Sequence, residues 1–189
     1  MTLAPHHGGH APGLARLPGG LSCEHRRWIV LNALAITAVF NLLINGGIAW
    51  LSGVGSTHIP LWAPPIISGP STITDTVGTL FLLPFITCLL VTSAVWRDRR
   101  RGALTPLRGM RMSAFARLPR RTALRGVAFG AICVGALGPA LVAILVAAGF
   151  AHPSVAEFVL YKAILGVLLG AVVTPAIALC AMTDDPDSP

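Results

Sequence analysis

The chain has 189 residues, of which 54% are hydrophobic and 11% are charged, and its formal net charge is +7. About a quarter of the residues in a soluble domain are charged, so this composition excludes an ordinary soluble protein and favours one that lies in a membrane. The basic residues are thirteen arginines and a single lysine, Lys162.

The first 27 residues are rich in glycine, proline and histidine and show no hydrophobic periodicity. We expect residues 1–27 to form a disordered tail. His6, His7 and His10 are potential metal ligands, but three histidines on an unstructured chain make a poor site. Neither a metal nor a cofactor is therefore predicted.

Four segments are long and apolar enough to cross a bilayer, namely residues 28–51, 76–96, 127–150 and 158–182. Spanning takes about 20 apolar residues, and a helix satisfies every backbone hydrogen bond within the segment. The expected fold is all-α: a polytopic membrane protein with four transmembrane helices in a bundle over residues 28–182. An acidic, solvated tail is expected over residues 183–189.

The first span carries Thr37, Asn41 and Asn45, which recur every four residues and therefore share one face of a helix. Asparagines in lipid need polar partners. Two readings stay open: these residues line a polar pocket, or they only join helices through hydrogen bonds.

The loop over residues 52–75 contains prolines that prevent a helix and apolar residues, including Trp62, that are unsuited to open water. We expect it to fold back over the helix ends with Trp62 at the membrane interface. Such a loop either caps the bundle or serves as a lid over a site.

The arginines predict the orientation. Three precede the first span, ten lie within residues 97–125, and none lies within residues 52–75 or 151–157. Because positive charge stays on the cytoplasmic side during insertion, both termini are expected in the cytoplasm, with the protein in the bacterial inner membrane.

The basic loop over residues 97–125 is expected to contact lipid. Apolar residues recur among the arginines at steps of three and four residues, which predicts a short helix on the membrane surface; they are Leu104, Leu107, Met110, Ala114 and Leu118. Anionic lipid is the expected partner, and nucleic acid is not, because no recognition motif accompanies the charge. The arginines assigned to lipid headgroups are Arg97, Arg99, Arg100, Arg101, Arg108, Arg111, Arg117, Arg120 and Arg121.

Lys162 lies within the last span, and Asp75 begins the second span at a similar depth. Lys162 can bend its stem toward the headgroups, or pair with Asp75 and so offset its desolvation. Ionisable groups inside a membrane are candidates for function, and Thr76 and Tyr161 are neighbours that add polar groups. The predicted ligand or ion pathway consists of Asn41, Asn45, Asp75, Thr79 and Lys162.

Two glycine motifs, Gly126 with Gly130 and Gly166 with Gly170, predict close helix packing, either within the chain or between copies.

An enzyme is a less favoured possibility. His58, His152, Asp75 and Glu157 are all expected on the outer side, but their spacing matches no catalytic constellation. The four cysteines show no zinc or redox spacing either. No catalytic residue is predicted.

Three stretches, FNLLINGGIAWLSG, DTVGTLFLLPFITCLLVTSAV and KAILGVLLGAVVTP, together resemble a group of small, uncharacterised bacterial membrane proteins with four spans. The resemblance covers roughly half of the chain. It implies the four-span architecture and no activity, so no functional residue is transferred from it.

Two functions are compatible with these features. The first is a transport, channel-like or ligand-binding protein with an outward-facing polar pocket, acting as an oligomer. The second is an accessory or scaffold subunit of a larger membrane complex. The intramembrane polar residues favour the first.

Overall fold

The computed structural model describes residues 23–63, 71–105, 107, 118–119 and 121–184. Its elements are α1 (Cys23–Trp28), the π-helix η1 (Ile29–Ala35), α2 (Ile36–Gly53), α3 (Thr72–Arg100), α4 (Thr122–Ala147) and α5 (Val155–Thr183). The first three follow one another without a break and form one continuous helical stretch. The described residues contain no strand, which confirms the all-helical expectation for this part of the chain.

Among the described residues, three helices are long and apolar enough to cross a membrane: α3, α4 and α5. A shorter apolar helix lies within α2, which has 18 residues. The protein is therefore membrane-embedded and helical. The stretch expected to be the first span is an α-helix only in its second part, because η1 precedes it.

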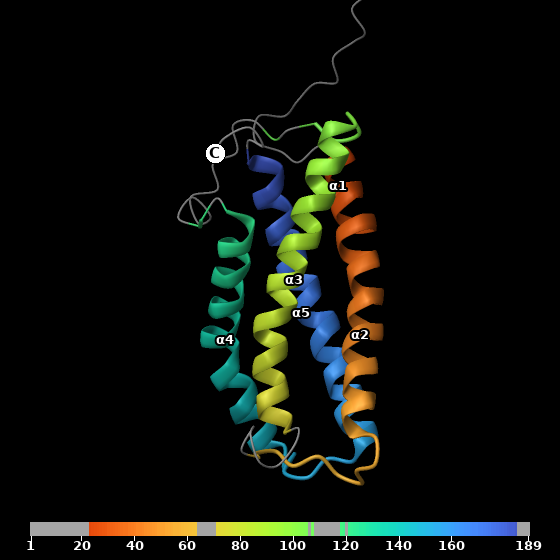
Figure 1. Ribbon diagram of the computed structural model, residues 1–189, viewed down its shortest axis with the longest axis vertical. Coiled ribbons are helices and arrows are strands. Elements are labelled where there is room, and N and C mark those ends of the chain that lie inside the picture. Colours follow the sequence, from red (N-terminus) through yellow and green to blue (C-terminus); the bar gives the residue numbers. More distant parts are fainter. Residues whose placement is uncertain (1–22, 64–70, 106, 108–117, 120, 185–189) are drawn as a thin grey trace, which may run out of the picture.

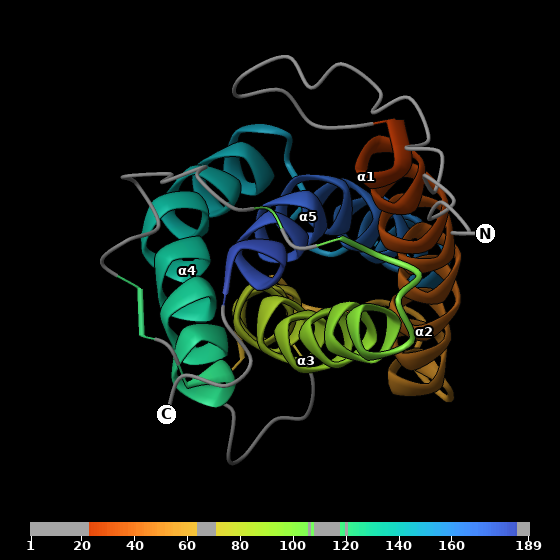
Figure 2. The ribbon, with the colours of Figure 1, turned by 90° about the horizontal axis from the view of Figure 1, so that it is seen from above.

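The helices run side by side along the length of an elongated bundle (Figure 1). Viewed along that axis, α2 and α4 lie on opposite sides of the pair formed by α3 and α5 (Figure 2). Helix α5 packs against α2 and α3, and α3 also packs against α4. Helix α5 therefore links the first helical stretch to the rest of the bundle.

The two ends of the bundle differ in composition. We call the end formed by residues 23–28, 97–105, 121–125 and 180–184 the arginine end, and the end formed by residues 54–63 and 148–155 the capped end (Figure 1). All arginines in the described ranges lie at the arginine end.

A short loop covers the capped end. The backbone N–H of Ile59 donates to Pro153 O at 3.0 Å, and that of Leu61 donates to Ala151 O at 2.9 Å. Ile59 is buried, whereas Trp62 is exposed. The expected return of this loop over the helix ends is confirmed for residues 58–63, and residues 64–70 lie outside the described part.

The starts of α3 and α5 are fixed by side-chain caps. Ser71 Oγ accepts from Thr74 N at 3.3 Å, and Ser154 forms a capping box with Glu157. Both serines satisfy backbone N–H groups that a helix leaves without partners. These caps place Asp75 and Lys162 near the capped end of the bundle.

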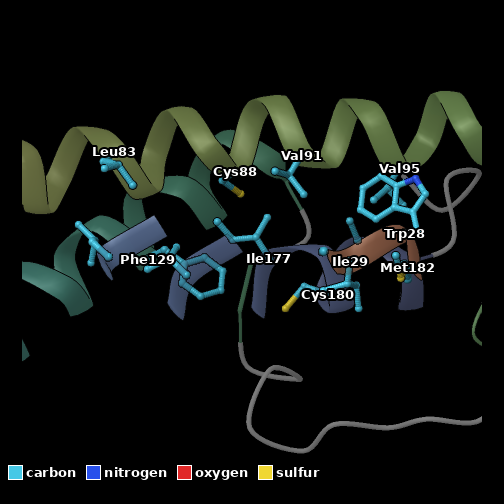
Figure 3. Packing of buried hydrophobic residues seen from close by; sticks show 14 of the residues in the cluster. Trp28, Ile29, Leu83, Cys88, Val91, Val95, Phe129, Ile177, Cys180 and Met182 are labelled. Atoms are coloured by element: carbon cyan, nitrogen blue, oxygen red, sulfur yellow. The ribbon is translucent and has the colours of Figure 1, made fainter. Parts of the chain in front are cut away.

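The main apolar core extends from the middle of the bundle to the arginine end. Trp28, Val95, Ile177 and Met182 belong to one buried cluster, in which side chains of α1, α3 and α5 meet (Figure 3). Phe129 extends the cluster into α4. Burial of this cluster therefore joins α1, α3, α4 and α5, and none of its residues lies on α2.

Helix α1 is fastened to the polar groups around this core. Trp28 Nε1 donates to Asp98 Oδ2 at 2.8 Å, and Thr105 N donates to Glu24 Oε1 at 3.2 Å. Residues 23–27, expected in the disordered tail, therefore begin the first helical stretch, because α3 and the residues after it supply partners for their side chains. Residues 1–22 lie outside the described part.

The basic loop also differs from the expectation where it is described. Leu104 is buried in the core instead of lying on a surface helix, and Leu107 N donates to Met182 O at 3.3 Å. Helix α3 extends to Arg100 and α4 begins at Thr122, so the connection is shorter than expected. Residues 108–117 lie outside the described part.

Candidate functional site

A groove of about 470 Å³ runs between α2 and α3 along the bundle. It forms because both helices pack against α5, which leaves a space between them. Asp75 and Asp98 line opposite ends of the groove, and their separation along α3 corresponds to about 35 Å at 1.5 Å per residue. That length is close to the thickness of a bilayer's hydrocarbon layer.

Apolar side chains form the rims of the groove. Each is about half exposed or more, because it lies on the open side of α2 or α3. The rim residues are Phe40, Ile44 and Ile48 on α2 and Leu82, Ile86 and Leu90 on α3. In a membrane these side chains face lipid, so the groove opens sideways into the bilayer.

Polar side chains follow the inside of the same groove from one end to the other, and we call them the polar track. All of them line the groove, and they come from α2, α3 and α5. The polar track consists of Thr37, Asn41, Asn45, Asp75, Thr79, Thr87, Arg97, Asp98 and Lys162.

Lys162 is the most deeply buried charge in the polar track, with an exposed fraction of 1%. Its Nζ lies 2.5 Å from Asp75 Oδ2, 3.1 Å from Asp75 O, and within hydrogen-bond reach of Thr79 Oγ1. Three acceptors match the three N–H groups of an ammonium. Of the two alternatives for this lysine, the structure shows the ion pair and not the extended, snorkelling side chain.

One end of the groove therefore carries two charges of opposite sign that neutralise each other. A buried ion pair costs desolvation energy that its mutual attraction only partly offsets. In α3, Thr79 Oγ1 also donates to Asp75 O at 2.9 Å, which orients the hydroxyl that receives the lysine. Lys162 is enclosed by its acceptors, whereas the Asp75 side chain is 24% exposed, so a polar group of a ligand in the groove reaches the pair through Asp75.

The asparagines of α2 meet the glycines of α5. A Cβ at Gly166 would come within 2.6 Å of Asn45 Nδ2, and a Cβ at Gly170 would overlap Asn41 Nδ2. Asn45 Nδ2 donates to Asn41 O at 3.0 Å, whereas Asn41 Nδ2, buried among the described residues, has no hydrogen-bond partner there. The asparagines line the groove and pack against α5, but the hydrogen bond of Asn45 Nδ2 stays within α2 and does not join two helices.

Both glycine motifs are used within the chain. Gly126 and Gly130 of α4 lie against Phe85 and Phe81 of α3, as Gly166 and Gly170 lie against α2. Among the described residues, each motif thus has a partner helix in the same molecule. This resolves the alternative that the sequence leaves open between packing within the chain and packing between copies.

The structure brings all five residues of the predicted ligand or ion pathway to this one groove. Thr76 and Tyr161, also expected near it, are hydrogen-bonded to each other at 2.9 Å and do not line it. Sequence reasoning missed Thr87 and the far end at Arg97 and Asp98. Thr87 was detectable, because it continues the four-residue spacing of Asp75 and Thr79 on α3.

A second hollow, of about 370 Å³, adjoins the far end of the groove. One face of the last turns of α3 lines it. The lining residues recur every three or four positions and therefore lie on the same side of the helix. Its residues are Ser93, Trp96, Arg97, Arg100 and Arg101. Arg97 lines both the hollow and the groove.

The arginines assigned to lipid headgroups are not equivalent. Arg97, Arg100 and Arg101 line the hollow, Arg121 is exposed before α4, and Arg99 Nη1 donates to Asp184 O. The remaining four, Arg108, Arg111, Arg117 and Arg120, lie outside the described residues.

Arg125, by contrast, forms a closed ion pair. Its Nη1 and Nη2 lie 2.5 and 3.1 Å from the two carboxylate oxygens of Asp184, and its Nε donates to Pro119 O at 3.1 Å. Asp184 was expected in a solvated tail. It is instead held at the end of α5, because the buried guanidinium of α4 requires a carboxylate.

The residues considered for an enzyme have other partners. Glu157 Oε2 accepts from Ser154 N at 2.8 Å, and His58 Nδ1 lies 3.2 Å from His152 O. Asp75 pairs with Lys162, at a different place. Over the described part of the chain, no three His, Cys, Asp or Glu side chains come together as a metal site.

The chain has no match among models of known protein families, curated proteins or solved structures.

Proposed function

We propose that this protein is a multi-pass membrane protein of the binding or transport type, and that the α2–α3 groove holds an amphipathic molecule. The observation that carries the proposal is the Lys162–Asp75 pair, which lines a groove with apolar rims. A polar group can contact the pair while an apolar chain lies between Ile48 and Leu82 or extends into lipid. Pockets that bind small molecules combine an apolar lining with a few polar groups in this way.

The length of the polar track supports transport as well as binding. Polar side chains recur from Lys162 at one end to Arg97 at the other. A polar headgroup moving between the two ends meets polar side chains over most of the path and crosses one apolar stretch between Thr87 and Arg97, with its tail in the surrounding lipid. The path opens to the side, so the proposed substrate is a lipid-like molecule and not a free ion.

We further propose that the stretch over residues 23–53 is the fourth span and that the arginine end faces the cytoplasm of a bacterium. The arginine-free loops at the capped end and the positive-inside rule support this orientation. An oligomer remains part of the proposal, with the groove left open to lipid, because a chain of 19.7 kDa seldom encloses a path alone. The scaffold alternative is weakened, since both glycine motifs have partners within the chain.

A groove-filling substitution tests the proposal. In Gly78→Phe, the new side chain enters the groove, and its Cβ meets no atom within 4 Å. Gly135→Phe on α4 is the matched control, because its Cβ also meets nothing within 4 Å and Gly135 does not line the groove. Both variants make the same exchange within a helix.

The measurement is native mass spectrometry of protein extracted in mild detergent, with the retained ligand read as added mass. Wild type and Gly135→Phe should carry an amphipathic adduct, and Gly78→Phe should lose most of it. Equal adduct on both variants, or none on wild type, contradicts the proposal.

A further inference from the structure

We propose that Arg97, Arg100 and Arg101 bind the phosphate group of an anionic lipid whose chain lies in the α2–α3 groove. This inference rests on the proposed function, because it names the class of molecule that enters the same groove. It adds a second, separate site for the headgroup, at the end of the groove opposite Lys162.

The hollow at the end of α3 has the chemistry of an anion site. Its three guanidinium groups come from one helical stripe and face a common space of about 370 Å³. Arg100 and Arg101 are exposed, and the Arg97 side chain is 62% exposed, with Asp98 Oδ1 3.6 Å from its Nε. A planar guanidinium donates two parallel hydrogen bonds to a phosphate.

The other two residues of the hollow add no free donor. Ser93 Oγ donates to Leu89 O at 2.7 Å, and Trp96 Nε1 is buried. Recognition of a phosphate in the hollow therefore rests on the three arginines.

The neighbouring arginines differ from the three that line the hollow, because they are bonded to Asp184. Arg99 and Arg125 both point to Asp184, so their charges are used to hold the end of α5. The three arginines of the hollow belong to the same end of the bundle but lie on another face of α3. Of the described arginines at this end, these three line one hollow together, whereas the exposed Arg26, Arg27 and Arg121 line neither the hollow nor the groove.

Arg97 decides between a lipid and a free anion. It lines the hollow and the groove at once, so a headgroup at the three arginines places its chain next to Leu90 and Ile86. Those rim side chains are 66% and 49% exposed and offer an apolar surface to that chain. A soluble phosphate uses the arginines but not the rims, whereas a phosphate-bearing lipid uses both.

The test compares two triple variants by titration in native mass spectrometry. Arg97→Gln/Arg100→Gln/Arg101→Gln removes the hollow's charge. Its matched control removes three exposed arginines elsewhere at the arginine end, and this control is Arg26→Gln/Arg27→Gln/Arg121→Gln.

The probes are phosphatidylglycerol, diacylglycerol with the same chains, and inorganic phosphate. Wild type should bind phosphatidylglycerol well above diacylglycerol. The hollow variant should lose affinity for it by about tenfold or more, and the control by about twofold or less, since each arginine near an anionic lipid contributes about one tenfold step or slightly less.

Three results overturn the inference. Equal losses in the two triple variants indicate a general charge effect. Equal binding of phosphatidylglycerol and diacylglycerol removes phosphate recognition, and displacement of the lipid by inorganic phosphate at a similar concentration identifies a soluble-anion site.

The two proposals fail in different ways. If Gly78→Phe keeps its adduct but the hollow variant loses phosphatidylglycerol, the headgroup site stands and the groove function falls. If Gly78→Phe loses its adduct but the hollow variant binds normally, the groove function stands and the phosphate assignment falls.

Discussion

In the part of the chain that the structure describes, two buried ion pairs join helices, and their surroundings separate a candidate site from a structural fastening. Lys162–Asp75 lines an open groove. Arg125–Asp184 lines neither hollow and has both carboxylate oxygens and a backbone carbonyl as acceptors. The chemistry of the two pairs is similar. What distinguishes a candidate binding site from a structural ion pair is therefore whether a ligand can reach it, and not charge alone.

The largest expected effect comes from leaving the lysine without its carboxylate. Asp75→Asn strands a buried ammonium, which should lower the free energy of unfolding by about 3–5 kcal/mol. Adding Lys162→Met should restore most of that loss, because no charge is then left buried. Thermal unfolding in detergent, with ligand retention measured in parallel, follows both effects.

The double variant sharpens the comparison. It should be folded but should bind the amphipathic ligand poorly, since both charges at the Lys162 end of the groove are absent. Full ligand retention by the folded double variant indicates that this pair, too, is only a fastening.

A smaller effect is expected at the other pair. Arg125→Gln leaves Asp184 near the end of the bundle with its side chain 24% exposed, so the carboxylate can regain water. The free energy of unfolding should fall by about 2 kcal/mol, the range of a hydrogen bond to a charged group. Ligand retention by the remaining folded protein should be unchanged, and a selective loss of ligand breaks the distinction between the two pairs.

The smallest effect is expected from a methyl group at the floor of the groove. Gly170→Ala should push Asn41 away from α5 and lower the free energy of unfolding by about 1 kcal/mol, the low end of the range for overpacking, because the atom it meets is the end of the Asn41 side chain. Gly47→Ala is the control, because its Cβ meets nothing within 4 Å, and it should be neutral or slightly stabilising. Equal stability of the two variants rules out the close contact between α2 and α5.

The sequence is informative wherever a pattern repeats locally. The apolar segments predicted helices, and the four-residue spacing of Asn41 and Asn45 predicted a shared face. The similar depths of Asp75 and Lys162 predicted their pairing, because two opposite charges in lipid stabilise each other when they meet. These inferences identified the five residues of the predicted pathway, all of which line the groove.

The other end depends on contacts that no local pattern contains. Trp28 and Asp98 are 70 residues apart in the chain, and Arg125 and Asp184 are 59 apart. Each such pair is set by how the helices pack. For the same reason, the arginines looked equivalent in the sequence, although the structure divides them between the hollow and Asp184.

The contact of α2 with α5 has a consequence for biogenesis. The ribosome makes α2 before the other long helices and α5 last, and the glycines that accommodate Asn41 and Asn45 are all on α5. In the proposed four-span arrangement, the early helix holds two amides in the membrane without their docking surface until α5 emerges. The α3–α4 hairpin can assemble during synthesis, whereas α2 must wait for the end of the chain. A nascent chain that stops before α5 therefore presents exposed amides that membrane quality control can recognise.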